Sequence, residues 1–316
     1  MATITVITPC YNSAKFIRET VGSVMAQDFP TWEYILVDDG STDETPAILA
    51  EFASSESRIK LLHQENKGTC AARNRGARES SADSKYFLFL DHDDLLERNA
   101  LRLLSEYLDA NPRVCLVGCQ FQEIDESGKP CSSRLRSRWV PSILGIPRPL
   151  CSFERVTPFV TFYCGTGQGP FALFRRSVFD QTTGWTTAFW PHEDTDMFCQ
   201  MALLGEVHYL PNRLYRKRLH PASGFANAEL VLNSYGLFRA KWDAYKPRNQ
   251  KEAMVLQKAS QFYRTSFQPL RNMKVSAKAV GEFIKSGDIK KLQWAFQLFR
   301  DAIQDAFYYR FTNKTS

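Results

Sequence analysis

The stretch "YFLFLDHDD" brings three carboxylates and an imidazole to the end of an apolar run: Asp91, His92, Asp93 and Asp94. Carboxylates this close repel one another unless a cation or several hydrogen-bond donors neutralise them. Mg²⁺ and Mn²⁺ prefer oxygen ligands, and an Asp-x-Asp spacing at the end of a strand can aim two carboxylates at one ion. The alternative is that Asp93 or Asp94 caps a helix that begins near Leu95. These residues by themselves favour neither.

A second acidic group lies much later in the chain, in "WPHEDTDMFCQ". Glu193 and Asp194, which follow His192, are two candidate general bases, because a carboxylate is suited to removing a proton from a hydroxyl. The helical pattern that comes next offers another interpretation. One of the three acids Glu193, Asp194 and Asp196 is then expected to be the N-cap of that helix.

Further polar groups follow other apolar runs. In "VDDGSTD" the adjacent acids Asp38 and Asp39 exceed what a tight strand-to-helix turn requires, and a carboxylate aimed out of a sheet can accept N–H bonds from a nucleobase. The stretch "ENKGTCAARNRG" puts Arg73 near a helix N-terminus, where backbone N–H groups and basic side chains bind anions. His220 follows three basic residues in "YRKRLHPASG". A lone His is usually structural, but beside a metal and a diphosphate it can act as a ligand.

Short apolar runs alternate with amphipathic stretches in the first part of the chain, which predicts βαβ units and a parallel sheet with helices on both faces. The expected strands are 4–9, 32–40, 58–64 and 86–91, and the expected helices are 14–27, 42–54 and 68–80, with Thr42 or Asp43 as the N-cap of the second. Ligands in such sheets bind at the carboxyl ends of the strands. Because polar groups follow each strand, four loops are expected to line one rim.

The second part of the chain is less regular. A strand over 113–125 precedes a Pro-, Arg- and Ser-rich stretch from Ser127 to Thr161, which is expected to be a long surface insertion. The pattern then predicts a strand and a short helix within 169–185, an acid-led helix and a strand within 192–211, and only helices from Ala226 onward. No GxGxxG or Walker A string is present, which argues against the dinucleotide and P-loop versions of this architecture.

The composition sets broader limits. The chain has 316 residues and is 44% hydrophobic, enough for one large domain or two smaller ones. Its eight cysteines form no CxxC pair, which favours free thiols in a reducing compartment. The N-terminus enters a strand pattern without a signal-peptide core, and no window holds the ~18 apolar residues of a spanning helix. We therefore expect a cytoplasmic protein, soluble or attached to the inner membrane face.

Charge is distributed unevenly along the chain. Residues 1–212 carry 20 Lys and Arg against 27 Asp and Glu, whereas residues 213–316 carry 20 against 7. A basic tail predicts an anionic partner or simply a solvated helical face. Its aromatic helices are expected either to pack on the rest of the chain or on a second subunit of a homo-oligomer, or to lie on an anionic bilayer near a lipid-linked acceptor.

Six strings occur in an order and spacing that resembles the family 2 glycosyltransferases with a GT-A fold: "TVITPCYN", "ILVDDGSTD", "NKGTCAARNRG", "FLFLDHDD", "GPFALFRRSVFDQTTGW" and "HEDTDM". The resemblance covers residues 3–221. It implies an α/β fold with a Rossmann-like, mostly parallel sheet flanked by helices, and a C-terminal helical extension. The implied domains are a catalytic domain at 1–225 and a helical region at 226–316.

The resemblance also implies an activity. A sugar would pass from a nucleotide-diphosphate donor to a hydroxyl of a glycan or lipid-linked acceptor, with inversion and with Mn²⁺ or Mg²⁺, in polysaccharide, cell-surface glycan or glycolipid synthesis. No nucleic-acid partner is expected. By motif position, the nucleotide would meet Thr8, Pro9 and Tyr11 around the nucleoside, Asp39 at the base N–H, and Arg73 nearby.

The family also implies catalytic and metal-binding roles. Asp91 would hold ribose or a metal-bound water, Asp93 would ligate the metal, and His220 would approach the metal or the diphosphate. Asp194, paired with Glu193, would be the catalytic base. These roles are chemically consistent, because a cation stabilises the leaving diphosphate while the acceptor attacks from the opposite face of the sugar and needs a base from another loop.

Two other classes remain open at this point. A nucleotidyltransferase also places paired acids on a metal, but it normally has a Gly-, Lys- or Arg-rich loop after the first strand, and "TPCYN" is not such a loop. A non-catalytic sugar-nucleotide-binding or scaffold protein can keep the same fold, although intact Asp93 and Asp194 argue against that interpretation. The residues leave the donor sugar and the acceptor undetermined.

Overall fold

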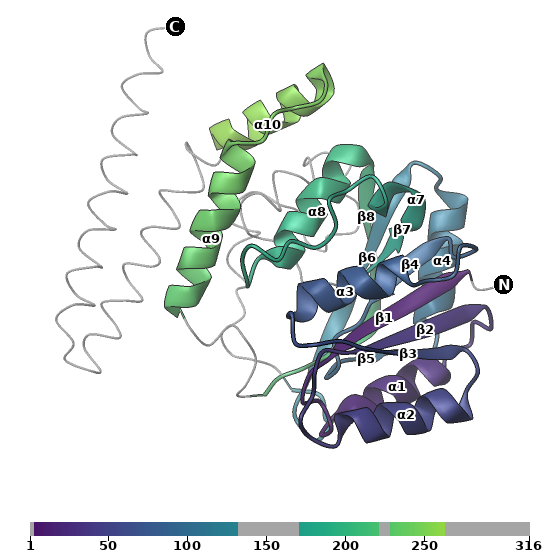
Figure 1. Ribbon diagram of the computed structural model, residues 1–316. Helices are drawn as coiled ribbons and strands as arrows, with labels where there is room; N and C mark the ends of the chain where they lie inside the picture. The colour runs from purple at the N-terminus through teal and green to yellow at the C-terminus, as the bar shows by residue number, and fades with distance from the viewer. Residues whose placement is uncertain (1–2, 132–170, 221–227, 263–316) are drawn as a thin grey trace, which may run out of the picture. The chain divides into compact units, whose positions relative to one another are not determined.

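The computed structural model describes residues 3–131, 171–220 and 228–262 (Figure 1). The chain divides into two compact units, Met1–Tyr245 and Lys246–Ser316. The first unit contains a β-sheet with helices on both faces, as Figure 1 shows. The α/β fold class is therefore confirmed.

Four parallel strands form one half of the sheet: β1 (Ile4–Cys10), β2 (Trp32–Asp38), β3 (Ile59–His63) and β4 (Tyr86–Phe89). Their connections contain three helices: α1 (Ile17–Met25), α2 (Thr45–Ser55) and α3 (Thr69–Arg78). β1 and β4 are buried along their whole length, because helices cover both faces, and this explains why β4 is wholly apolar and why β1 is apolar apart from its two threonines. The predicted alternation is confirmed, so the carboxyl ends of these strands meet at one edge.

The other half of the sheet is mixed and contains β5 (Leu95–Leu96), β6 (Val114–Ile124), β7 (Ala172–Arg175) and β8 (Glu206–Arg218). β7 runs antiparallel to both β4 and β6, while β8 runs parallel to β6. The strand order is β3-β2-β1-β4-β7-β6-β8-β5. Pairing of Leu95 with Arg216 carries the end of β8 to the acidic loop that precedes β5.

The remaining described helices are α4 (Ala100–Ala110), α7 (Arg176–Phe179), α8 (Glu193–Leu204), α9 (Ala228–Asp243) and α10 (Gln250–Phe262). The first unit contains α9, whereas α10 belongs to the second. The boundary between the two units, after Tyr245, therefore follows α9. The domain boundary expected from sequence, at residue 225, precedes α9. Most of the expected insertion and the last expected helices lie outside the described residues.

Two of the three predicted helix caps are wrong. Leu95 and Leu96 form a short strand and α4 begins at Ala100, so Asp93 and Asp94 cap no helix there. The N-cap of α8 is His192, with φ of 92°, and the acids that follow it lie inside the first turn. At α2 the N-cap position is Glu44, but the carboxylate of Asp43 accepts a hydrogen bond from the Thr45 N–H at 2.9 Å, as a capping side chain does.

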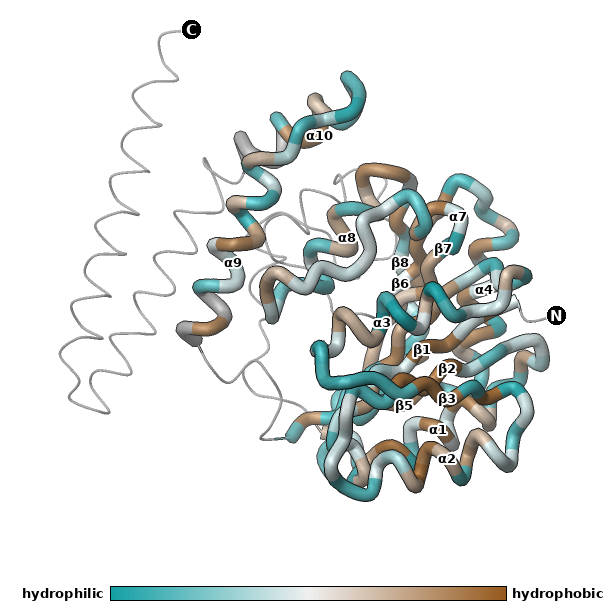
Figure 2. The backbone as a smooth tube through the Cα atoms, viewed as in Figure 1, coloured by the Kyte–Doolittle hydropathy of each residue, from teal (hydrophilic) through white to brown (hydrophobic). Residues whose placement is uncertain are grey.

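The hydrophobic core lies along the central strands, as the brown tube segments of Figure 2 show, and hydrophilic residues gather in the loop between β3 and α3. Within the described ranges, no helix combines the length and apolarity needed to cross a membrane. One close approach sets the position of α3 on the sheet. A Cβ atom at Gly76 would lie 2.5 Å from Cγ2 of Ile7 on β1, so only glycine allows this helix to pack so near.

We predict that Gly76→Ala destabilises the protein by about 1–3 kcal/mol, because the added methyl group forces Ile7 and α3 apart. Gly22→Ala in α1 is the matched control, since a methyl group added at Gly22 would meet no atom within 4 Å. That control is expected to be neutral or to stabilise by up to about 1 kcal/mol through helix propensity. Urea denaturation of both variants measures the difference, and equal stabilities would contradict the packing argument.

Candidate active site

The loops after β1 and β2 are joined by hydrogen bonds at the carboxyl edge of the sheet. The backbone N–H of Asn12 donates to the Ser41 hydroxyl at 3.1 Å, and the Asn12 side-chain oxygen accepts from the Thr42 N–H at 2.9 Å. Asn12 adopts φ of 47°, a left-handed conformation that Asn tolerates better than most residues. These contacts give the first two of the four predicted rim loops a defined shape.

Asp39 closes the loop that follows β3. Its carboxylate is 2% exposed and accepts three hydrogen bonds, from the Gln64 amide at 2.6 Å, the Lys67 N–H at 2.9 Å and the Gly68 N–H at 2.8 Å. Its neighbour Asp38 accepts from the Ser41 N–H and contacts the His63 ring, both at 3.1 Å. Loop closure therefore accounts for both acids, and contact of Asp39 with a nucleobase stays a prediction.

The three residues expected around the nucleoside differ in accessibility. Thr8 is fully buried and its hydroxyl lies 2.9 Å from the Tyr34 hydroxyl, inside the core. Pro9 is also buried. Tyr11 is 45% exposed, so its side chain is open to a ligand at the sheet edge. Of the three, Tyr11 is the one whose ring can lie against a base.

Arg73 links the acidic loop after β4 to the start of α8. Its guanidinium is 2% exposed, donates to Asp91 at 2.6 Å and to Glu193 at 3.4 Å, and lies 4.5 Å from the centre of the Trp185 ring. Burial opposes the charge of Arg73, but the two carboxylates outweigh it and raise its pKa. Burial likewise works to raise the pKa of Asp91, yet the adjacent guanidinium holds that pKa below its ordinary value.

Asp93 and His220 lie in direct contact, with Oδ2 of the carboxylate 2.7 Å from Nε2 of the imidazole. Asp91, Asp93 and Asp94 each offer an oxygen atom, and these oxygens all lie within 4.8 Å of one another. Oxygen ligands in such a group, with one imidazole beside them, suit Mn²⁺ or Mg²⁺. Residues separated by more than a hundred positions in sequence thus form one cluster that fits a divalent cation.

Asp94 differs from its two neighbours. It is 3% exposed and accepts hydrogen bonds from the Tyr215 hydroxyl at 3.0 Å and from the backbone N–H of Arg218 at 2.7 Å. Burial, and then the charges of Asp93 and Asp91, raise the pKa of Asp94 well above its ordinary value. Asp94 therefore fastens the acidic loop to β8, in place of the helix-capping role that the sequence suggested.

The first turn of α8 carries the candidate bases. Glu193 is 8% exposed, and burial together with the charge of Asp194 raises its pKa to about 7, against the opposing effect of Arg73. Asp194 is half-buried and accepts a hydrogen bond from the Thr195 N–H at 2.6 Å. The Arg73 contact places Glu193 beside the acidic loop, which brings the two predicted catalytic segments into one site.

Residues 5–183 match the sequence model of Glycosyl transferase family 2. The chain belongs to this family. Among solved structures, a GT-A mannosyltransferase from Pyrobaculum calidifontis in complex with GDP-Man and Mn²⁺ is similar with 19% identity and a TM-score of 0.62, covering 99% of this chain and 88% of that one. TarS 1-349 from S. aureus in complex with UDP-GlcNAc has 18% identity and a TM-score of 0.64, covering 97% and 82%. These likenesses confirm the GT-A fold.

A curated relative adds a closer sequence match. The putative teichuronic acid biosynthesis glycosyltransferase TuaG of Bacillus subtilis is 40% identical over 106 residues, which is 33% of this chain and 41% of that protein. The chain spans less than half the length of the first curated relatives it matches.

Two further groups at the site of this glycosyltransferase were not apparent from its sequence. Asp196 is fully buried and accepts hydrogen bonds from Lys241 at 2.6 Å, Trp242 at 2.9 Å and Gln200 at 2.9 Å, which fasten α9 to α8. Lys241 belongs to the basic tail. A count of charges does not show which basic residues of that tail pair with a buried carboxylate and which face solvent. The second group surrounds Arg218, one of three basic residues in a run whose members look alike in sequence.

We predict that Glu193→Gln stabilises the glycosyltransferase above neutral pH relative to the unchanged chain. The folded pKa is raised from 4.5 to about 7, so the stability contributed by Glu193 is complete below 4.5 and is lost as pH rises through 7. The difference in free energy of unfolding between variant and parent should thus grow between pH 5 and 8, by an amount on the order of 2 kcal/mol.

Urea denaturation at both pH values measures this change. Glu106→Gln is the matched control, because it makes the same substitution at a side chain that is 59% exposed on α4. A pH-independent difference for Glu193→Gln would contradict the raised pKa.

Proposed function

We propose that this chain transfers a sugar from a nucleotide-diphosphate donor to an acceptor hydroxyl, with a divalent cation and with inversion at the anomeric carbon. The observation that carries the proposal is the meeting of the acidic loop and His220 with the first turn of α8, through Arg73, at the carboxyl edge of a GT-A sheet. Family membership supports the reaction class.

Asp93 and His220 would hold the cation, with Asp91 supporting it directly or through water. The chemistry of these donors fits Mn²⁺ or Mg²⁺, and the Mn²⁺ in the structure of the P. calidifontis mannosyltransferase supports the same choice. A bound cation supplies a Lewis acid that offsets the charge developing on the leaving diphosphate. Asp94 is left out of this ligand set, because its carboxylate is buried and already accepts two hydrogen bonds.

The nucleotide would lie along the loops after β1, β2 and β3. Tyr11 would pack against the base, and Asp39 would receive the base N–H, with Thr8 and Pro9 bordering the nucleoside through the backbone of β1. Donors of this class are supported by the similar structures, which bind UDP-GlcNAc and GDP-Man. Arg73 would position the site indirectly, because its hydrogen bonds to Asp91 and Glu193 hold the acidic loop next to α8.

Asp194 would be the base that removes the proton from the acceptor hydroxyl. Glu193 is buried and engaged by Arg73, whereas Asp194 is half-buried and accepts hydrogen bonds from its own neighbour Thr195. A base on α8 lies on a different segment from the acidic loop, as direct displacement with inversion requires. Glu193 would assist by fixing the first turn of α8.

The acceptor is proposed to be a growing glycan or a lipid-linked saccharide in polysaccharide or cell-surface glycan synthesis. The name of the related TuaG, a putative teichuronic acid glycosyltransferase, supports this class of product. Screening nucleotide sugars with Mn²⁺ tests the whole proposal. The true donor is expected to be hydrolysed slowly and to raise the melting temperature by mass action, and failure of every nucleotide sugar in both assays would overturn it.

We predict that Asp93→Ala abolishes turnover and metal-dependent donor binding, because the carboxylate in contact with His220 is lost. Asp83→Ala is the control, since this exposed aspartate precedes β4 whereas Asp93 follows it. The assay is Mn²⁺-dependent donor hydrolysis together with thermal stabilisation by donor. Undiminished activity of Asp93→Ala would contradict the assignment of Asp93 as a ligand of the cation.

We predict that Asp194→Asn keeps donor affinity and lowers kcat by a factor of about 100 or more, because only proton removal is lost. Isothermal titration with donor and steady-state kinetics measure the two quantities separately. Collapse of donor affinity would instead assign Asp194 a structural role.

A further inference from the structure

Arg218, the last residue of β8, is a fully buried cation with four hydrogen-bond acceptors. Its Nε donates to the carbonyl oxygen of Asp93 at 2.9 Å, and its Nη2 donates to the Glu19 carboxylate at 2.8 Å. Its Nη1 donates to the carbonyl oxygens of Asp125 at 3.3 Å and of Glu126 at 2.9 Å. A charge in the interior is tolerated only with such pairing, so these acceptors are required for Arg218 to remain there.

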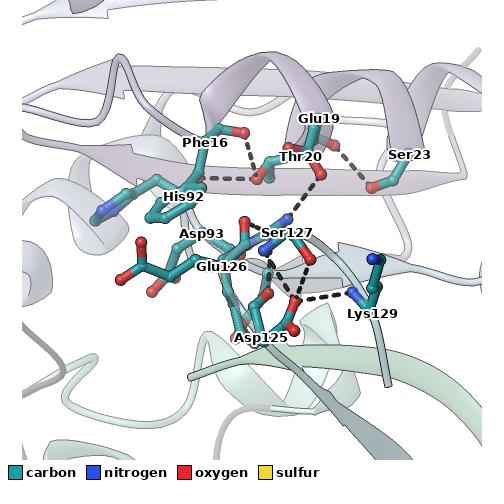
Figure 3. Close-up of polar contacts among 12 residues, drawn as sticks. Phe16, Glu19, Thr20, Ser23, His92, Asp93, Asp125, Glu126, Ser127 and Lys129 are labelled. Atoms are coloured by element: carbon teal, nitrogen blue, oxygen red, sulfur yellow. Dashed lines mark hydrogen bonds and ion pairs between the residues drawn. The ribbon is translucent and has the colours of Figure 1, made fainter. Parts of the chain in front are cut away.

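The acceptors come from three segments that are far apart in sequence. Figure 3 shows that Glu19 on α1, Asp93 in the acidic loop and the turn from Asp125 to Lys129 lie close to one another. The turn is held by its own hydrogen bonds, since the Asp125 carboxylate accepts from the N–H groups of Ser127 at 2.9 Å and Lys129 at 3.0 Å. Arg218 therefore connects pieces that are each already ordered.

Arg218 also constrains both members of the Asp93 and His220 pair. The Arg218 side chain donates to the backbone carbonyl of Asp93, and the Arg218 backbone N–H donates to the carboxylate of the adjacent Asp94 at 2.7 Å. His220 follows only two residues later, and the Phe16 ring packs against both the guanidinium, at 4.6 Å, and the imidazole, at 5.5 Å. Because Arg218 binds the carbonyl of Asp93 and not its carboxylate, the carboxylate is left to contact His220.

We infer that Arg218 is the positioning residue of the cation site formed by Asp93 and His220, and that Glu19 is its counter-ion. The inference rests on the proposed metal-dependent function. The physical reason has two parts. The guanidinium orients the carboxylate and the imidazole, as groups behind metal ligands do, and Glu19 cancels a positive charge that would otherwise repel the cation.

The test uses the full chain with the substitutions Arg218→Lys and Glu19→Gln. Titration with Mn²⁺ alone, followed by the electron paramagnetic resonance signal of free Mn²⁺, gives the Kd. We expect the Kd to rise about tenfold for Arg218→Lys, and by a smaller factor for Glu19→Gln. The Glu19 side chain is 54% exposed, and Gln keeps an oxygen that can accept from Nη2 of Arg218, so Glu19→Gln is expected to fold. This variant therefore tests the inference even if Arg218→Lys does not fold.

A second readout separates positioning from a merely structural role. For the nucleotide sugar that the unchanged chain hydrolyses, the Mn²⁺ concentration that half-saturates the rate should rise in both variants, while the rate at saturating Mn²⁺ recovers. Loss of structure alone would lower the maximal rate without moving the half-saturating concentration.

The same strand provides a matched control. Arg216 pairs with Glu97 at 2.5 Å and has a side chain that is 43% exposed, so Arg216→Lys and Glu97→Gln change the same residue types away from the pair of interest. Both variants should bind Mn²⁺ within about twofold of the unchanged chain.

Asp93→Asn distinguishes a failure of the proposed metal site from a failure of the proposed role of Arg218. If it binds Mn²⁺ normally, the proposed metal site fails. If it binds weakly while folded Arg218→Lys and Glu19→Gln bind normally, the role of Arg218 is overturned.

Discussion

Repulsion among carboxylates at one edge of the sheet is the constraint on which the rest of the site depends. Asp91, Asp93 and Asp94 offer oxygens within 4.8 Å of one another, and each is accommodated in a different way. A guanidinium stabilises the first, an imidazole contacts the second, and a phenol with a backbone N–H binds the third. Because clustered charges are costly without partners, each contact stabilises the loop, and every one of these partners comes from another element.

Two buried arginines, on different elements, connect the acidic loop to the rest of the fold. Arg73 lies on α3 and ties the acidic loop to α8, while Arg218 lies at the end of β8 and ties the same loop to α1 and to the turn after β6. The mixed half of the sheet makes the second connection possible. Pairing of β8 with β5 delivers the end of β8 to the acidic loop, so His220 meets Asp93 although they are far apart in the chain.

Neutralisation by a partner also distinguishes acids that look alike in sequence. Asp94 is satisfied by two donors and has a raised pKa, whereas the Asp93 carboxylate contacts only an imidazole among the described residues. On α8, Glu193 is engaged by Arg73 and Asp196 by three donors, whereas Asp194 accepts hydrogen bonds from its adjacent Thr195. Acids that look alike in sequence therefore differ in the donors that their carboxylates bind.

Local patterns predicted the parallel βαβ half of the sheet correctly, because mainly apolar runs such as β1 and β4 are followed by polar turns and amphipathic helices. Helix caps were predicted wrongly where tertiary contacts override local preference. Leu95 and Leu96 are too short a run to show a strand pattern, and they are extended because β8 supplies hydrogen-bonding partners for them. The hydrogen bonds by which the Asp39 carboxylate closes the loop after β3 were not apparent from sequence, because their donors belong to a separate loop.

The sequence by itself determined the glycosyltransferase class, the edge of the sheet where the polar loops meet and the residue types gathered there, because strand ends and family motifs are local features. Tertiary structure alone decided which acid meets which partner. That assignment depends on Arg73, Arg218 and Lys241, each of which has another basic residue one or two positions away in the sequence. Burial against one particular carboxylate or carbonyl separates them from solvated residues, and such burial exists only once distant elements have packed.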